Sequence, residues 1–409
     1  MKIALVSPYD FAYPGGVVNH ITCLCNQLTM RGHDVRIIAP ASKVVPDFDR
    51  RFIPVGRPRP LPVSGSVARI TLSPWLSRAV KRIYAQEKFD IVHLHEPFMP
   101  MLCTTFLRLS RAPTVGTFHA SGGQSWYKLS WYTYSTPFGK WLLRKWSRNL
   151  TGRIAVSPIA LSFVSKYFHH DYTVIPNGID AAHFHPDVSP IPEYDDGRPN
   201  IVFVGRMEKR KGVNYLIKAF QVVKREIPDC RLIIVGPGTR LRKRYEGHVR
   251  KYNIKDVVFV GYASYDDLPR YYRTATVVCA PAIGWESFGI VLLEAMAVGK
   301  PLVASNIAGY ASVINDGEDG MLVPRRNTRE LSSALVKVIK DKSLQQRLGE
   351  RGREKAIRYD WSEVTERLVN FYKETIVRYN GGMKNAVPDQ YLHGKIERNP
   401  DSSLPSRNA

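Results

Sequence analysis

Short apolar runs bounded by Gly, Pro or His recur along the whole chain. In the first half, these runs predict strands at residues 3–7, 35–39, 91–95, 114–118, 154–156 and 173–175. In the second half, they predict strands at residues 201–204, 232–235, 257–260, 277–280 and 302–304. Segments with helical spacing of apolar residues separate the runs. This alternation predicts an α/β protein with a parallel sheet in each half.

The domain boundaries follow from composition. Residues 186–199 are rich in Pro and Asp, which predicts a linker between a first domain at 1–185 and a second at 200–358. A helical pattern after Asp360 predicts a helix at 359–379, which we expect to pack back toward the first domain. From residue 380 to 409 the chain is polar and rich in Gly, Asn, Ser and Pro, so we expect a disordered tail.

Length and composition restrict the class of protein. The chain has 409 residues, enough for two cores, and its 44% of apolar residues fits a globular protein. It contains no apolar run of about 18 residues, the length needed to cross a membrane. Its first ten residues resemble a strand more than a signal peptide. Its five cysteines lie mostly in apolar runs, which favours a reducing cytoplasm over a disulfide framework.

The charge indicates an anionic partner. Lys and Arg outnumber Asp and Glu by 59 to 36, a formal net charge of +23. Nucleic acid, anionic lipid and a phosphorylated substrate would each fit this surplus. Because no recognisable nucleic-acid-binding motif is present, we expect no nucleic-acid partner.

Two segments combine basic residues with an apolar face. In residues 75–84, one helical face carries Arg78, Lys81 and Arg82. In residues 140–148, a stripe of Lys140, Arg144 and Arg148 lies beside two tryptophans. Such helices suit the surface of an anionic membrane, although a solvated helix that buries its tryptophans is the alternative. We expect peripheral association with the cytoplasmic face of the plasma membrane.

Candidate phosphate-binding loops follow the first strand of each half. The pair Gly15-Gly16 opens a helix, where backbone N–H groups favour an anion. In the segment 205–212, Arg206 and Lys211 can converge on a diphosphate, Arg through its planar fork and Lys as a point charge. A turn and a basic surface loop are the structural alternatives.

Two glutamates eight residues apart form a third candidate site. If a helix starts near Phe288, Glu286 lies in the loop at its N-terminus and Glu294 about two turns inside it. Glu286 would then face a ligand beside free backbone N–H groups, and Glu294 would reach a polyol such as a ribose. A capped amphipathic helix is the alternative.

These motifs occur together in one order: Pro14-Gly-Gly-Val, His95-Glu-Pro, Thr117-Phe-His119, Ile154-Ala-Val-Ser157, Ile175-Pro-Asn-Gly178, Gly205-Arg206, Lys211-Gly212 and Glu286-Ser-Phe-Gly to Glu294. In this order the chain resembles glycosyltransferase family 4, over residues 1 to about 375. The resemblance implies the GT-B fold, with two Rossmann-like domains that face a central cleft. It is strongest to the phosphatidylinositol α-mannosyltransferases, through Gly65-Ser-Val-Ala-Arg69, the helix at 75–84 and Asp360-Trp361-Ser362.

The resemblance implies a role for each candidate residue. Arg206, Lys211, His119 and Glu286 would be catalytic, with His119 beside the reacting sugar. The residues implied to bind the nucleotide-sugar donor are Gly15, Gly16, Arg206, Lys211, Glu286, Ser287, Phe288, Gly289, Ile290 and Glu294. The residues implied to meet the acceptor phosphate and the membrane are Ser66, Arg69, Arg78, Lys81 and Arg82.

The implied reaction is retaining transfer of a hexosyl group, mannose from GDP-mannose, to a membrane lipid such as phosphatidylinositol. No cofactor and no essential metal are expected, since Arg206 and Lys211 would stabilise the leaving diphosphate. One position departs from the pattern of the lipid mannosyltransferases: Gln124 stands where a Lys typically follows the histidine by five residues. The alternatives are transfer of glucose, galactose or GlcNAc from a UDP-sugar to diacylglycerol or another glycan, and epimerisation of a nucleotide sugar.

Overall fold

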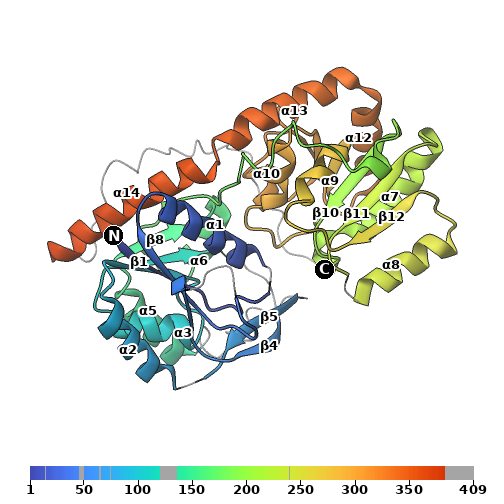
Figure 1. Ribbon diagram of the computed structural model, residues 1–409. Helices are drawn as coiled ribbons and strands as arrows, with labels where there is room; N and C mark the ends of the chain where they lie inside the picture. The colour runs from blue at the N-terminus through green and yellow to red at the C-terminus, as the bar shows by residue number, and fades with distance from the viewer. Residues whose placement is uncertain are drawn as a thin grey trace.

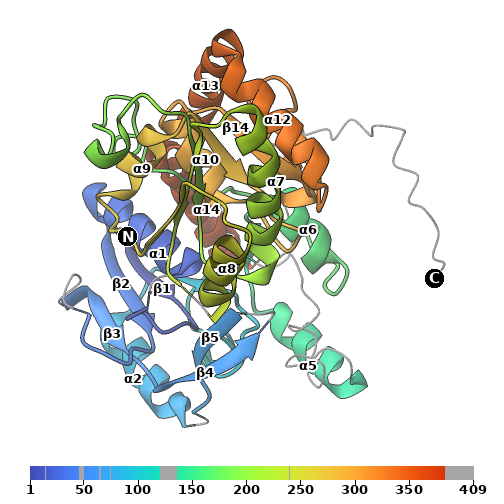
Figure 2. The ribbon, with the colours of Figure 1, turned by 90° about the vertical axis from the view of Figure 1, so that its right-hand side faces the viewer.

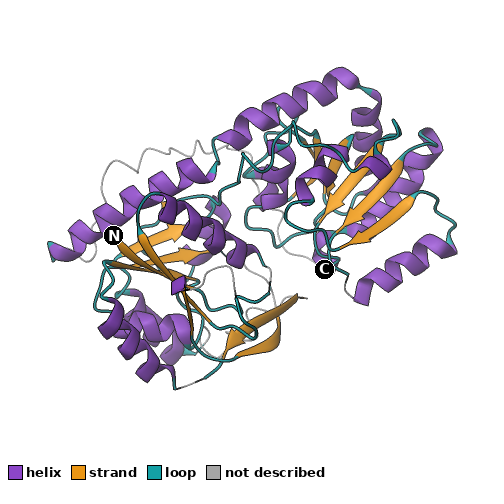
Figure 3. Ribbon diagram, in the orientation of Figure 1, coloured by secondary structure: helices purple, strands orange, loops and turns teal. Residues whose placement is uncertain are grey.

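The computed structural model describes residues 1–13, 15–45, 50–63, 66–73, 75–119, 136–238 and 240–382. Within these ranges, two parallel sheets flanked by helices form two domains (Figures 1 and 3). This confirms the predicted α/β class. Gln124 and residues 383–409 of the predicted tail lie outside the described ranges.

The first domain is built on a seven-stranded parallel sheet in the order β3-β2-β1-β6-β7-β8-β9. Its strands are β1 (Lys2–Val6), β2 (Asp34–Ala39), β3 (Phe52–Pro54), β6 (Ile91–His95), β7 (Thr114–Phe118), β8 (Gly152–Ala155) and β9 (Thr173–Val174). Its helices are α1 (Gly16–Met30), α2 (Leu76–Glu87), α3 (Leu102–Leu109), α5 (Pro137–Ser147) and α6 (Pro158–Ser165). In β1, Ile3 and Leu5 face the core beneath α1, whereas Ala4 and Val6 face the core beneath α2 and α3. The central strand is therefore apolar on both faces, as parallel sheets require.

The second domain contains six parallel strands in the order β12-β11-β10-β13-β14-β15. They are β10 (Asn200–Val204), β11 (Arg231–Val235), β12 (Val257–Gly261), β13 (Val277–Ala280), β14 (Leu302–Asn306) and β15 (Met321–Pro324). Its helices are α7 (Val213–Glu226), α8 (Arg240–Lys251), α9 (Leu268–Thr274), α10 (Ile290–Ala297), α11 (Ala308–Ala311), α12 (Thr328–Lys340) and α13 (Lys342–Ile357). Because all strands are parallel, the loops after β10 and β13 open at the same edge of the sheet.

Within the described residues the last helix is α14 (Trp361–Asn380), which follows the second domain in sequence but lies along the first (Figure 1). Asp360 caps it, since its Oδ1 accepts the N–H of Ser362 at 2.8 Å. Trp361, Leu368 and Tyr372 are buried in the same core as α1 and β1. Gly178 makes room for this packing, because a Cβ there would lie 2.4 Å from the Trp361 ring. None of the helices in the described ranges has an apolar stretch long enough to cross a membrane.

Three parts of the sheets are absent from the sequence-based prediction. They are β3, β15 and an antiparallel hairpin of β4 (Pro58–Val63) and β5 (Ser66–Thr71). Prolines normally argue against a strand, and β4 contains three of them, at positions 58, 60 and 62. Because they alternate, their missing N–H groups all fall on one edge of β4, and pairing with β5 uses the other.

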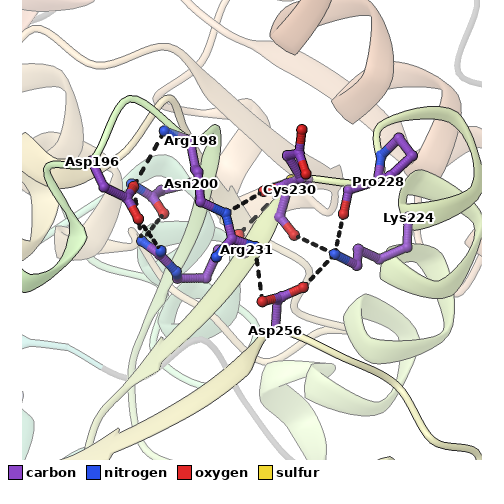
Figure 4. A network of polar contacts seen from close by, with 9 residues as sticks. Asp196, Arg198, Asn200, Lys224, Pro228, Cys230, Arg231 and Asp256 are labelled. Atoms are coloured by element: carbon purple, nitrogen blue, oxygen red, sulfur yellow. Dashed lines mark hydrogen bonds and ion pairs between the residues drawn. The ribbon is translucent and has the colours of Figure 1, made fainter.

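A polar network fixes the end of the interdomain segment 186–199 to the second domain (Figure 4). Arg231 Nη2 lies 2.5 Å from Asp196 Oδ2, and Arg198 Nη2 lies 2.8 Å from Asp256 Oδ1. Lys224 Nζ reaches the other oxygen of Asp256 at 2.5 Å. These contacts join the start of β10 to the starts of its neighbour β11 and of the next strand, β12, at the sheet edge opposite the loops described next.

Candidate active site

The loop after β10 brings several basic side chains to the carboxyl edge of the second sheet. Lys211 ends a short 3-10 helix (Lys209–Lys211), and Gly212 follows with a φ of +74°. A Cβ on Gly212 would lie 1.8 Å from the carbonyl oxygen of Pro281 in the loop after β13, so only glycine permits this contact. The glycine thereby fixes Lys211 beside the second loop, which carries Glu286.

Glu286 is the centre of a buried ion-pair cluster. Lys211 Nζ lies 2.7 Å from Glu286 Oε1, and the Arg210 guanidinium donates to the same oxygen. Burial alone would raise the pKa of Glu286, but the charges of Lys211 and Arg210 outweigh it and hold the pKa below its ordinary value. Glu286 is therefore ionised at neutral pH and cannot act there as a general acid.

Arg210 was not among the residues predicted from the sequence. Its Nε donates to Glu208 Oε2 at 2.9 Å, and Arg206 Nη2 lies 3.3 Å from the other oxygen of that carboxylate. The basic run 206–211 indicated a cationic site in the sequence. It does not reveal which of its side chains turn inward. Arg206 has 46% of its side chain exposed and is accessible to a ligand, whereas Lys211 has 12%.

The glutamate motif begins its helix later than predicted. Gly289 has a φ of +93°, which an α-helix excludes, so α10 starts at Ile290 and Glu294 lies in its second turn. A Cβ on Gly289 would lie 2.6 Å from the Tyr310 ring. The side chain of Phe288 is buried in the core of the second domain. Ser287 and Ile290 are half-buried beside it.

Glu294 has the opposite pKa shift from Glu286. Burial raises the pKa of Glu294 to about 6, although the Tyr272 hydroxyl donates to its Oε2 at 2.6 Å and favours the ionised form. Since its charge is only partly compensated, this carboxylate retains acceptor capacity for hydroxyl groups of a ligand.

A second residue missed by the sequence reasoning adjoins this motif. Trp285 has a φ of +60° and is 49% exposed, immediately before Glu286. A bulky side chain rarely adopts this backbone region, so the position is strained.

In the first domain, His119 belongs to a group of stacked imidazoles. Its backbone N–H donates to Glu96 Oε1 at 2.9 Å, and its Nε2 lies 3.0 Å from His95 Nδ1. The ring of His20 from α1 meets that of His119 edge-on, with centroids 4.9 Å apart. Burial, followed by the neighbouring rings, lowers the pKa of both His95 and His119 well below the ordinary value. The cluster is therefore neutral at physiological pH.

The hydrogen bonds assign the tautomer of His119. His95 Nε2 is buried and has no hydrogen-bond partner among the described residues. A buried N–H without an acceptor costs more than a bare lone pair, so the proton of His95 belongs on Nδ1 and is donated to His119 Nε2. His119 then carries its own proton on Nδ1.

The same histidines offer a geometry that could hold a metal ion. One ring nitrogen each from His20, His95 and His119 lies within 4.8 Å of the others. Neutral imidazoles are suitable ligands for transition metals. The expectation that no metal is essential stays a prediction.

The predicted phosphate-binding glycines open α1. Gly15 is the N-cap residue in an extended conformation, and Gly16 is the first helical residue. A Cβ added at either would meet no atom within 4 Å, so space is open beside the first turn. Its N–H groups lack intrahelical acceptors and can approach an anion there.

Helix α1 also faces the second domain. The pKa of Cys23 in α1 is raised to about 11 by burial and then by the charges of Asp180 and Glu294. Cys23 of α1 therefore lies near Glu294 of α10 in the second domain.

The predicted acceptor and membrane residues lie elsewhere on the first domain. Ser66 and Arg69 are in β5 of the hairpin. Arg78, Lys81 and Arg82 are exposed on α2, whose Leu76, Val80 and Ile83 are buried as predicted. Trp75 before α2 is 86% exposed. Figures 1 and 2 both place α2 on the side of the first domain away from the second.

Comparison with known proteins identifies the family. The model for "Glycosyltransferase Family 4" matches residues 14–183, and the model for "Glycosyl transferases group 1" matches residues 186–355. The chain is 37% identical to phosphatidyl-myo-inositol mannosyltransferase of Mycobacterium leprae, over 91% of this chain and 96% of that protein. It is 34% identical to the protein of the same name from Propionibacterium freudenreichii, over 96% of this chain and 100% of that protein.

Solved structures agree on the fold. Sucrose-phosphate synthase from Thermosynechococcus elongatus matches with a TM-score of 0.73 and 22% identity, covering 92% of this chain and 99% of that one. Anabaena HepE in complex with UDP and glucose matches with a TM-score of 0.69 and 19% identity, covering 91% and 100%. Two parallel-sheet domains with these neighbours confirm the GT-B fold. The chain is a glycosyltransferase and belongs to glycosyltransferase family 4.

Proposed function

We propose that the protein transfers mannose from GDP-mannose to phosphatidylinositol at a membrane surface, with retention of configuration. The observation that carries the proposal is the 34–37% identity, over nearly the full length, to proteins named phosphatidyl-myo-inositol mannosyltransferase. The site residues described above supply groups suited to each part of such a reaction.

The cations after β10 would bind the donor diphosphate. Breaking the bond between the sugar C1 and the phosphate oxygen places negative charge on the leaving group. Arg206, accessible and planar, and Lys211, held beside the loop of Glu286 by Gly212, would stabilise this charge where it develops. The open first turn of α1 would contribute N–H groups from the other domain.

The two glutamates would hold the sugar and the ribose. Glu286 stays ionised between Lys211 and Arg210 and would accept hydroxyls of the donor hexose. Glu294, with Tyr272 on one oxygen, would accept the ribose hydroxyls. His119, neutral and with its proton on Nδ1, would donate to the reacting sugar.

A front-face displacement is the favoured route to retention. The acceptor hydroxyl would attack C1 from the side of the departing diphosphate and pass its proton to the leaving oxygen. The alternative, a covalent glycosyl-enzyme, needs a nucleophilic carboxylate, and Glu286 is engaged by two cations. A trapped glycosyl-enzyme with a slow donor analogue would contradict this mechanism.

Helix α2 would bring the enzyme to its substrate. Its exposed Arg78, Lys81 and Arg82 would attract anionic lipid, and the exposed Trp75 would insert at the interface. Peripheral association with the cytoplasmic face of the plasma membrane belongs to this proposal.

A panel of donors and acceptors tests the proposal. Purified protein is given GDP-mannose, UDP-glucose, UDP-galactose or UDP-GlcNAc, together with anionic vesicles that contain phosphatidylinositol, diacylglycerol or neither. Mannose transfer that requires phosphatidylinositol is the expected result, and NMR of the product should show the α-anomer. Transfer of another sugar or to diacylglycerol would overturn the assignment of donor or acceptor. Activity in EDTA tests the expectation that no metal is essential.

A further inference from the structure

The loop that leads to Gly15-Gly16 is attached to the hairpin that carries Arg69. Tyr9 forms an antiparallel bridge with Ile70, and the backbone N–H of Asp10 donates to the carbonyl oxygen of Arg69 at 2.8 Å. The loop after β1 and the β4–β5 hairpin are therefore connected to each other at the carboxyl end of β1.

Within this unit, two cations converge on one aromatic ring. The guanidinium carbon of Arg69 lies 4.1 Å from the centroid of the Tyr13 ring, and Lys43 Nζ lies 6.0 Å from it. Tyr13 is 38% exposed, Arg69 is half-buried and Lys43 is exposed. Neither cation forms an ion pair with a carboxylate within the described ranges of the chain.

A buried carboxylate holds the two loops together. Asp10 is 2% exposed, and its Oδ1 accepts the N–H of Ala12 at 3.2 Å and that of Ser42 at 3.0 Å. Asp10 thus links the loop of Tyr13 to the loop of Lys43. The other oxygen, Oδ2, is buried and has no hydrogen-bond partner among the described residues, and Asp10 forms no ion pair with Arg69 or Lys43 there, so it does not neutralise either cation.

The contact between the Arg69 guanidinium and the Tyr13 ring limits what a ligand here can be. An aromatic ring on the face of a guanidinium leaves its in-plane N–H groups free, and these bind phosphate oxygens in pairs. Lys43 adds a point charge on the same ring. A phosphate with one or two negative oxygens fits this arrangement better than a neutral polyol does.

We propose that Tyr13 is a positioning residue for the acceptor: its ring orients Arg69, and with Lys43 forms a site for the phosphodiester of the lipid headgroup. This inference depends on the proposed function only for the identity of the lipid. It makes Tyr13 a determinant of acceptor affinity, with no part in binding the donor.

The test compares Tyr13→Leu, which removes the ring, with Tyr13→Phe, which keeps it. Tyr13→Leu should raise the KM for phosphatidylinositol in vesicles about threefold to tenfold, with kcat and the KM for GDP-mannose within about twofold of the unmodified protein. Tyr13→Phe should restore the acceptor KM. The matched control is Tyr252→Leu, which removes a 54% exposed tyrosine beneath Lys251 in the second domain and should change neither KM.

A double-mutant cycle shows whether the ring acts through the guanidinium. In an Arg69→Gln background, Tyr13→Leu should have little further effect on the acceptor KM. If Tyr13→Leu leaves the acceptor KM unchanged, or raises it equally with and without Arg69, the proposal is wrong.

A binding measurement separates this inference from the proposed function. Calorimetry measures the affinity for glycerophosphoinositol and for inorganic phosphate without any transfer. Weaker binding of both by Tyr13→Leu supports a site for phosphate as such, and weaker binding of glycerophosphoinositol alone supports a site for the diester headgroup. If the protein fails to mannosylate phosphatidylinositol yet shows either dependence, the function is wrong and the site stands. If it mannosylates phosphatidylinositol but Tyr13→Leu does not change the affinity for either compound, the site is wrong and the function stands.

Discussion

At the scale of single residues, partners decide the charge of a buried carboxylate. Glu286 and Glu294 lie on the same motif, yet their pKa values move in opposite directions. Two cations compensate the burial of Glu286, whereas a neutral tyrosine hydroxyl compensates that of Glu294 only in part. The spacing of the motif was visible in the sequence, but these partners come from distant segments.

The pKa of Glu294, about 6, predicts a pH dependence of donor binding. Below this pH the carboxyl is protonated and loses acceptor capacity for the ribose hydroxyls. We expect the KM for the nucleotide sugar to rise about tenfold between pH 7 and pH 5. The change should be much smaller in Glu294→Gln, which cannot titrate. An equally steep pH profile in that variant would assign the dependence to another group.

Lys211 is expected to stabilise the leaving diphosphate. Lys211→Ala should lose about 3–4 kcal/mol of transition-state stabilisation, a fall in kcat of about 10²–10³-fold. Lys209→Ala, which removes an exposed lysine two residues away, is the matched control and should retain its rate. Arg206→Ala should resemble Lys211→Ala. Near-normal turnover of both active-site variants in steady-state assays would remove them from the mechanism.

The strained backbone of Trp285 predicts a gain in stability on substitution. Its φ of +60° suits glycine, so Trp285→Gly should raise the free energy of unfolding by about 1 kcal/mol. Urea denaturation measures this change. A loss of stability would mean that packing of the indole outweighs the backbone strain.

At the scale of elements, helices and strands were predicted correctly where apolar residues recur at a clear spacing or in an unbroken run. The strand at 91–95 coincides with β6, whose five residues are all buried and whose Ile91, Val92 and Leu94 are apolar. Helix α2 shows the predicted split between buried Leu76, Val80 and Ile83 and an exposed basic face. The hairpin escaped prediction because prolines in β4 conceal a strand that pairs along one edge only.

The basic face of α2 predicts a specific loss of membrane binding. Replacing Arg78, Lys81 and Arg82 with Ser should reduce sedimentation with phosphatidylinositol vesicles and the lipid-dependent rate, since each cation contributes about 1 kcal/mol. Donor affinity should not change. Replacing Arg240, Lys243 and Arg244 on exposed α8 removes the same charge and should leave vesicle binding intact. Equal losses in both triple variants would indicate a general charge effect.

At the scale of the whole molecule, helix α14 follows the second domain in sequence and packs on the first. Tyr372 of α14 lies against β6, and its hydroxyl is 2.6 Å from His93 Nδ1. The other nitrogen of His93 lies 2.6 Å from Thr117 Oγ1. The sequence predicted a helix at 359–379 that packs back toward the first domain, and in the structure Trp361, Leu368 and Tyr372 of α14 are buried in the first core.

Tyr372→Phe should therefore weaken the first domain and spare the second. The substitution leaves one nitrogen of buried His93 without a partner, which costs about 1–3 kcal/mol. Hydrogen exchange of the amides in β6 and β7 should become faster, while exchange in β10 and β11 stays the same. Faster exchange in both sheets would show that the domains unfold together.

Because α14 packs on the first domain, that domain can finish folding only late in translation. Domains usually fold in the order of their synthesis, as each leaves the ribosome. Here the core of the first domain lacks one of its helices until residues 361–380 have been synthesised. These residues follow the whole second domain in the sequence. The nascent first domain must keep an apolar surface exposed throughout that interval. A fragment ending at residue 185 should therefore depend on chaperones, and adding α14 as a separate peptide should restore its fold.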